Sequence, residues 1–274
     1  MTTPSPTLAA LAAVMTAGAL MLATRSQDFT NAAVDGHALR MLVAGTGDAT
    51  VVFENGCCPS LESWDNVQRE VSRFATTVAY DRAGIGLSAD GPLPRDGARI
   101  AAELHRALEL AGFPPPYVLV GASLGGPYVR IFAGLYPDEV AALVLVDPTH
   151  DAEDFAELED AGIPELDAWP ETRTQARDSP VPPGVPVFLI DARAPADVPF
   201  ATAAIREARA EGQRELAAES LGYEEWLAGV PRGELVVTEQ SGHNVAIEQP
   251  ELVVTTIRRA VEAARATRGR ESSP

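Results

Sequence analysis

The sequence has few of the residues that build disulfide frameworks and metal sites. Among its 274 residues are two cysteines, Cys57 and Cys58, which are neighbours in the chain. They make no disulfide framework, because adjacent cysteines seldom bridge each other. The four histidines are far apart and there is no Cys-x-x-Cys pair, so no metal motif is visible. We therefore expect no metal and no other cofactor.

Positive charge is also scarce. Lysine and arginine together number 21 against 39 aspartates and glutamates, and the formal net charge is −18. So acidic a chain repels nucleic acid and anionic lipid, and it disfavours strongly anionic substrates. We expect a neutral small-molecule substrate and no nucleic-acid partner. The sequence leaves the oligomeric state open.

A long apolar run lies near the N-terminus, where residues 8–23 are uncharged and rich in alanine. The run is long enough for the core of a signal peptide and short for a membrane-spanning helix. No lysine or arginine precedes it, which argues against export. Residues 1–27 are therefore either a signal or membrane anchor, or an apolar extension packed on the domain. Membrane association would depend on this run alone, and the choice between a cytoplasmic and an exported protein stays open.

Most of the chain alternates short apolar strands with amphipathic helices. Continuous apolar strands of this kind predict a mostly parallel sheet covered on both faces, and right-handed crossovers make it doubly wound. We expect one α/β domain over residues 28–266 and a flexible tail over 267–274. The strands are expected within 34–48 and at 50–54, 76–80, 117–121, 142–146, 186–190 and 235–238, and the main helices at 60–74, 95–111, 125–135 and 251–264.

Two polar segments interrupt this alternation, at residues 149–184 and 195–230. The first is acidic and broken by prolines, and it contains two weak helical patches. We expect the two segments to form a small helical lid over the strand ends. Residues 151–178 should be more mobile than the sheet, because they have fewer buried apolar contacts than the sheet does.

The motif Gly-x-Ser-x-Gly occurs at Gly121, Ser123 and Gly125, between a predicted strand and a predicted helix. A strand that turns into a helix within a few residues makes a tight bend, and the glycines avoid the clash that a Cβ atom would cause. The bend holds the Ser123 hydroxyl at the helix N-terminus, where developing negative charge is favoured. The motif also occurs in ordinary glycine-rich turns, so a nucleophilic role depends on partners elsewhere in the chain.

A serine nucleophile needs a base within hydrogen-bond reach. His243 follows the last predicted strand in a Ser-Gly-His loop and is the expected base. His37 is expected in an early turn and His105 on an amphipathic helix, where histidines are usually structural. His150 follows a strand and is placed to line the mouth of the pocket.

The base in turn needs a carboxylate to orient it. Asp147 and Asp191 each end a predicted strand, and Asp197 lies a little further on. All three lie between Ser123 and His243 in the chain. Asp147 and Asp191 can equally be turn-capping residues. We favour Asp147 as the acid and keep Asp191 as the alternative.

A reaction at Ser123 also needs two backbone N–H donors for the oxyanion. We expect them from Leu124, directly after the serine, and from Cys57, in the loop after the 50–54 strand. Nothing in the pattern activates either cysteine as a nucleophile. Asp81 and Arg82 are expected to pair with each other in a structural turn.

Five segments, in this order and spacing, resemble the α/β-hydrolase superfamily over roughly residues 33–265. The resemblance implies Ser123 as nucleophile, His243 as base, and an acid after the strand at 142–146 or the one at 186–190. It implies a serine hydrolase that cleaves a small or medium neutral carboxylic ester through an acyl-serine. The same triad serves lactones, amides, C–C bonds or acyl transfer, and a non-catalytic ligand-binding protein of this fold is the other alternative. The segments are Val51–Gly56, Tyr80–Ser88, Gly121–Gly126, Leu143–Asp147 and Ser241–His243.

This sequence departs from the family pattern in three places. Asn55-Gly56 stands where the family commonly has His-Gly, and the elbow reads Gly-Ala-Ser instead of Gly-His-Ser. Neither change removes a catalytic group. The residues after Asp191 lack the usual acid spacing, which is why we favour Asp147.

Overall fold

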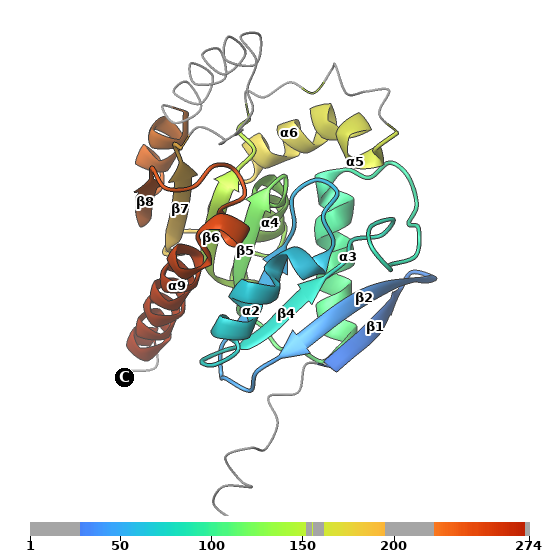
Figure 1. Cartoon of the computed structure of the whole chain (residues 1–274), viewed down its shortest axis with the longest axis horizontal. Coiled ribbons are helices and arrows are strands. Elements are labelled where there is room, and N and C mark those ends of the chain that lie inside the picture. The colour runs from blue at the N-terminus through green and yellow to red at the C-terminus, as the bar shows by residue number, and fades with distance from the viewer. Residues whose placement is uncertain (1–27, 152–154, 156–161, 195–221, 272–274) are drawn as a thin grey trace, which may run out of the picture.

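The computed structural model describes residues 28–151, 155, 162–194 and 222–271. An eight-stranded sheet forms its centre (Figure 1). In chain order the strands are β1 (Asp28–Val34), β2 (His37–Ala44), β3 (Thr50–Glu54), β4 (Thr76–Tyr80), β5 (Tyr117–Ser123), β6 (Val140–Pro148), β7 (Val187–Ala192) and β8 (Gly233–Thr238).

The strands lie in the order β1-β2-β4-β3-β5-β6-β7-β8. Every pairing from β4 to β8 is parallel, whereas β1–β2 and β2–β4 are antiparallel. This arrangement confirms the predicted α/β class with a mostly parallel sheet. The carboxyl ends of β3, β5 and β6 therefore lie side by side, at the edge where such sheets bind ligands.

Strand β1 was not predicted from the sequence. It forms a hairpin with β2 through Asp35 and Gly36, which both have positive φ. Only Ala32 and Val34 of the seven residues in β1 are buried. Because this edge strand has no continuous apolar run, its sequence carries little strand signal.

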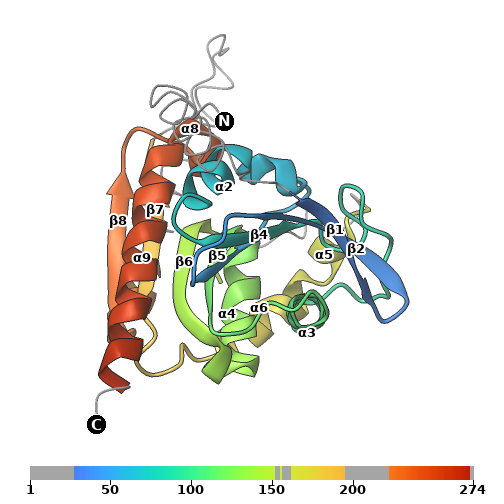
Figure 2. The same cartoon turned by 90° about the horizontal axis from the view of Figure 1, so that it is seen from below.

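The helices cover both faces of the sheet, with α3 and α4 on one and α2 and α9 on the other (Figure 2). Periodic apolar residues explain the long helices, and Asp96 caps α3 by accepting from the N–H groups of Ala98 and Arg99. The helices are η1 (Leu61–Trp64), α2 (Asp65–Val71), α3 (Gly97–Leu110), α4 (Gly125–Leu135), η2 (Pro137–Glu139), α5 (Pro164–Asp167), α6 (Trp169–Asp178), α8 (Val245–Glu248) and α9 (Pro250–Glu271).

The core has two main layers, one on each side of the sheet. Successive residues of a strand point to opposite faces, and β5 shows this clearly. Leu119 packs in the layer of Phe132 from α4, whereas Val120 packs in the layer of Ile257 from α9. All four side chains are fully buried, so the strand that carries Ser123 is held firmly from both sides.

The described part of the first lid segment packs against the helices on one face of the sheet. Helices α5 and α6 lie at one end of the molecule, next to α3 and α4 (Figure 1). Trp169 and Ala176 are buried, and the Thr172 hydroxyl accepts from the Gly97 N–H at 2.9 Å. Three of the ten residues of α6 are buried, against eight of nine in β6. The helix therefore has fewer buried residues than the sheet, as expected, and its greater mobility stays a prediction.

The expectations for the C-terminal tail, the N-terminal run and the second lid segment can be compared with the structure only in part. Helix α9 continues to Glu271, so the tail predicted from residue 267 is helical up to that point. Residues 1–27 and 195–221 lie outside the described residues, and residues 222–228 are helical. Within the part of the chain that the structure describes, no helix is long and apolar enough to cross a membrane.

Candidate functional site

Ser123 lies at the sharp turn between β5 and α4. Its backbone has a φ of +50°, a left-handed conformation that a non-glycine residue adopts at a cost. A Cβ atom on Gly121 would lie 2.3 Å from the carbonyl oxygen of Gly125, so the bend requires glycine there. The structure thus has the strained strand-to-helix turn that exposes a serine hydroxyl in nucleophile elbows.

A bulge at the end of β6 directs Asp147 away from β5. Ala122 pairs with Val146 and Ser123 with Pro148, so Asp147 is the extra residue between them, with a φ of +43°. Bulges re-aim side chains in this way.

The Asp147 carboxylate is held from two sides. Its Oδ2 lies 2.7 Å from Nδ1 of His243, and its Oδ1 accepts from the N–H of Ala192 at 2.9 Å. The carboxylate is buried, whereas the His243 side chain is 58% exposed. This histidine is oriented by a fixed carboxylate and remains accessible from the pocket.

Asp191, the alternative acid, has a different partner. Its Oδ2 accepts from Nε of Arg193 at 2.7 Å. The structure therefore brings Asp147, the favoured candidate, to His243. Asp197 lies outside the described residues.

Ser123 and His243 line the same pocket, which has a volume of about 330 Å³. The pocket lies at the carboxyl ends of β3, β5 and β6 and is lined largely by apolar side chains. Its lining residues are Asn55, Gly56, Cys57, Pro59, Ser63, Trp64, Ala122, Ser123, Val146, His243, Asn244, Val245, Ala246 and Ile247.

The other histidines have partners elsewhere. His37 lies 3.6 Å from Glu103, and His105 stacks on Tyr136 with ring centroids 4.0 Å apart. His150 meets the Tyr223 ring edge-on and lines a separate small cavity. The expectation that His150 lines the pocket mouth is therefore wrong.

The loop after β3 presses against the serine. A Cβ atom on Gly56 would lie 2.8 Å from the Cβ of Ser123, so only glycine permits this approach. Cys57 follows and lines the pocket, and Leu124 sits at the N-cap of α4. The two residues expected to donate to an oxyanion thus lie on the two backbone segments that flank Ser123.

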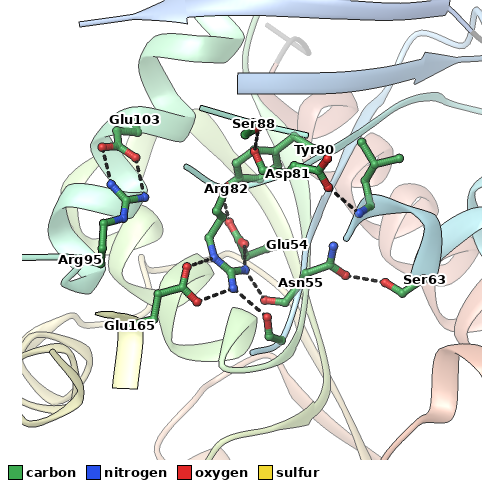
Figure 3. A network of polar contacts seen from close by, with 12 residues as sticks. Glu54, Asn55, Ser63, Tyr80, Asp81, Arg82, Ser88, Arg95, Glu103 and Glu165 are labelled. Carbon is green, nitrogen blue, oxygen red and sulfur yellow. Dashed lines mark hydrogen bonds and ion pairs between the residues drawn. The ribbon is translucent and has the colours of Figure 1, made fainter. Parts of the chain in front are cut away.

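A buried arginine anchors this loop (Figure 3). Arg82 donates from Nη1 to the carbonyl of Asn55 and from Nη2 to the carbonyl of Gly56, both at 2.7 Å. It also pairs with Glu54 of β3 at 2.7 Å and with Glu165 of α5 at 2.6 Å. One side chain therefore ties the loop beside Ser123 to the sheet and to the lid.

Asp81 does not pair with Arg82, which corrects the expected local turn. Its Oδ1 accepts from the N–H of Leu61 at 2.7 Å, and its Oδ2 accepts from the N–H of Leu87 at 3.1 Å. Asp81 therefore fixes the start of η1 and the glycine-rich turn, whereas Arg82 acts on the loop at residues 55–56.

Burial and charge interactions shift the pKa values of this cluster in opposite directions. Burial by itself lowers the pKa of Arg82, but the carboxylates of Glu165 and Glu54 raise it well above its ordinary value. Burial raises the pKa of Glu54, against the effect of Arg82, and Tyr80 donates a short hydrogen bond to Glu54. Glu54, a charged residue at the end of the otherwise apolar strand, is the sequence signal for this cluster. From the sequence, no buried ion pair was predicted at this position.

Residues with metal-binding side chains do not gather in the described part of the chain. No group of three or more histidine, cysteine, aspartate or glutamate side chains there is placed to hold a metal ion.

Comparison with known proteins agrees with the fold. A family model described as "alpha/beta hydrolase fold" matches residues 49–181. The chain is 32% identical over 104 residues to the uncharacterised protein YqjL of Bacillus subtilis, covering 38% of this chain and 41% of YqjL. A thermophilic esterase from Thermogutta terrifontis superimposes with a TM-score of 0.60 at 18% identity, covering 86% of this chain and 99% of the esterase.

A second solved structure with the same architecture is CarC, a serine hydrolase involved in carbazole degradation. It superimposes with a TM-score of 0.58 at 16% identity, covering 86% of this chain and 99% of CarC. The family model over residues 49–181, the strand order and these structures agree that the chain has the α/β-hydrolase fold.

Proposed function

We propose that the protein is a serine hydrolase that cleaves a small or medium neutral carboxylic ester through an acyl-serine intermediate. The observation that carries the proposal is the 2.7 Å contact between His243 Nδ1 and Asp147 Oδ2, at the pocket that Ser123 also lines. A nucleophile, a base and an orienting acid are the three groups that acyl transfer to serine requires.

In this mechanism Asp147 fixes the tautomer of His243. With the proton on Nδ1 and directed at Asp147, the lone pair of the neutral imidazole is on Nε2. Nε2 takes the hydroxyl proton as Ser123 Oγ attacks the ester carbonyl. The same nitrogen then gives that proton to the leaving alcohol, and Asp147 stabilises the imidazolium formed in between.

The tetrahedral intermediate carries negative charge on the former carbonyl oxygen. Backbone N–H groups of Cys57 and Leu124 are the proposed donors to that oxygen. Arg82 supports the first of them, because it holds the carbonyls of Asn55 and Gly56 just before it. Water activated by His243 then hydrolyses the acyl-serine.

Two features favour a neutral substrate of modest size. The pocket holds about 330 Å³ and is lined by apolar side chains such as Trp64, Val146 and Ile247. The net charge of −18 repels anionic substrates.

Covalent labelling tests the proposal directly. A fluorophosphonate probe should modify the protein at Ser123, as read by peptide mass spectrometry. Ser123→Ala should lose both labelling and turnover of a panel of esters with increasing acyl chain length, while its circular dichroism stays unchanged. Ser72→Ala, at the C-terminal cap of α2, is the matched control and should keep both. A wild-type protein that is neither labelled nor active would favour the non-catalytic binding alternative. A folded Ser123→Ala protein that keeps most of its activity would refute Ser123 as the nucleophile.

A further inference from the structure

The two cysteines of the chain lie closer together than their sequence position suggested. Their Sγ atoms are 2.6 Å apart, which is shorter than the van der Waals contact distance of two sulfur atoms. Cys57 is half-buried and lines the pocket, whereas Cys58 is exposed and has a φ of +70°. An exposed thiol thus lies directly against a second thiol that faces the candidate active site.

The backbone on both sides of this pair is anchored. Upstream, Arg82 holds the carbonyls of Asn55 and Gly56. Downstream, the Asp81 carboxylate accepts from the N–H of Leu61. Any change in the geometry of the two cysteines must therefore be absorbed by the few residues between these anchors, which include the pocket-lining Cys57.

We propose that Cys57 and Cys58 are a reversible oxidation site, which closes to an intramolecular disulfide and thereby lowers the activity of the neighbouring catalytic site. The oxidant is a low-molecular-weight disulfide such as oxidised glutathione. The effect on activity rests on the proposed hydrolase function, whereas formation of the bond does not.

The exchange proceeds in two balanced steps. The exposed thiolate of Cys58 attacks one sulfur of the small disulfide, which forms a mixed disulfide and releases one small thiolate. Cys57 then loses its proton and attacks Sγ of Cys58, which expels the second small thiolate. The protein loses two protons and two electrons, and the small disulfide becomes two thiols.

Ring closure changes the backbone at Cys57. Neighbouring Cα atoms are about 3.8 Å apart across a trans peptide, whereas bridged cysteines usually have Cα atoms about 4.4–6.8 Å apart. Because the planar peptide fixes the distance between neighbouring Cα atoms, closure must distort or rotate the peptide between Cys57 and Cys58 and change the φ and ψ angles beside it. Because the N–H of Cys57 is a proposed oxyanion donor, we expect a misaligned donor and a loss of activity of about tenfold or more.

Oxidation in a glutathione buffer tests the proposal on the full chain. The sequence holds no other cysteine, so an intramolecular disulfide can only be this pair. After treatment and alkylation of free thiols, the wild-type protein should lack two hydrogen atoms and carry neither alkyl groups nor glutathione. Its kcat/KM for an ester should fall about tenfold or more and return after reduction with dithiothreitol.

Cys58→Ser is the matched control, because its side chain belongs to no part of the proposed machinery. The reduced variant should keep wild-type activity and lose little of it in the same oxidising buffer. A stable glutathione adduct, a covalent dimer, or no reaction in the wild-type protein would overturn the proposal. So would a full internal disulfide that leaves kcat/KM unchanged. The mass change reports formation of the disulfide whether or not the protein turns over an ester. Ester turnover by the reduced protein tests the hydrolase function separately.

Discussion

Asp147 and His243 are 96 positions apart in the chain, yet their side chains meet at 2.7 Å. Two local features make the contact. The bulge at the end of β6 turns the carboxylate toward β7, where the Ala192 N–H fixes its other oxygen. The loop after β8 then places the His243 ring against it. Their contact is the central geometric feature of the candidate site.

The first prediction concerns this contact. Asp147→Asn should lower kcat by a factor on the order of 10³ to 10⁴, because the imidazole loses its orienting carboxylate and the wrong tautomer is favoured. Asp191→Asn should cost much less, since Asp191 binds Arg193 instead. Both variants are compared at equal folded concentration. If Asp191→Asn lost most of its kcat and Asp147→Asn kept nearly all of it, the acid would be Asp191.

The second prediction concerns the link between lid and loop. Glu165→Gln removes one of the two carboxylates that pair with buried Arg82. We expect the free energy of unfolding to fall by about 3–5 kcal/mol, as for other broken buried pairs. The kcat should also fall several-fold with little change in KM, because Arg82 positions the loop that carries a proposed oxyanion donor.

Glu103→Gln separates these two effects. Glu103 forms an equally buried pair with Arg95 at 2.7 Å, and this pair makes no contact with the loop at residues 55–56 (Figure 3). The control should lower stability in urea unfolding and leave kcat within about twofold. Equal losses of kcat in both variants would show that Glu165 acts only through stability.

The third prediction concerns the pocket mouth, where Ile247 lines the pocket and is 60% exposed. Ile247→Glu should raise KM several-fold for esters with longer acyl chains and much less for acetyl esters, because it places a charge beside the apolar part of the substrate. Stability should change by less than about 0.5 kcal/mol, as for most surface substitutions. Leu87→Glu, also exposed but outside the pocket lining, should leave all KM values unchanged. Equal shifts for short and long chains would contradict an acyl-binding role.

The fourth prediction concerns thiol reactivity. Burial raises the pKa of Cys57 to about 12, and the neighbouring Cys58 adds to the shift. The thiolate is the reactive form, so free Cys57 is mostly protonated near neutral pH and reacts slowly with a reagent from solution. Both this reaction and the closure of the mixed disulfide should become faster as the pH rises. Each cysteine can be alkylated alone in the variant that lacks the other one. Iodoacetamide should modify Cys57 in the Cys58→Ser variant at least about tenfold more slowly than it modifies Cys58 in the Cys57→Ser variant. Mass spectrometry over time measures both rates, and equal rates near neutral pH would rule out this protection.

The sequence by itself determined the architecture and the chain order of the candidate groups. Apolar runs such as 51–53 and 142–146 are local signals, because a strand buried on both faces is apolar along nearly its whole length. The glycines around Ser123 are local in the same sense, since the sharp turn excludes side chains at Gly121. These signals sufficed for the parallel sheet and for the elbow.

Only the tertiary structure decided which side chains meet. Asp147 and Asp191 both end strands, and a bulge that depends on the register between β5 and β6 brings one of them to His243. Arg82 looked like the partner of its neighbour Asp81, but it binds Glu165, which is 83 positions away. Such pairings depend on the direction of a side chain across packed elements, and local periodicity carries no information about that direction.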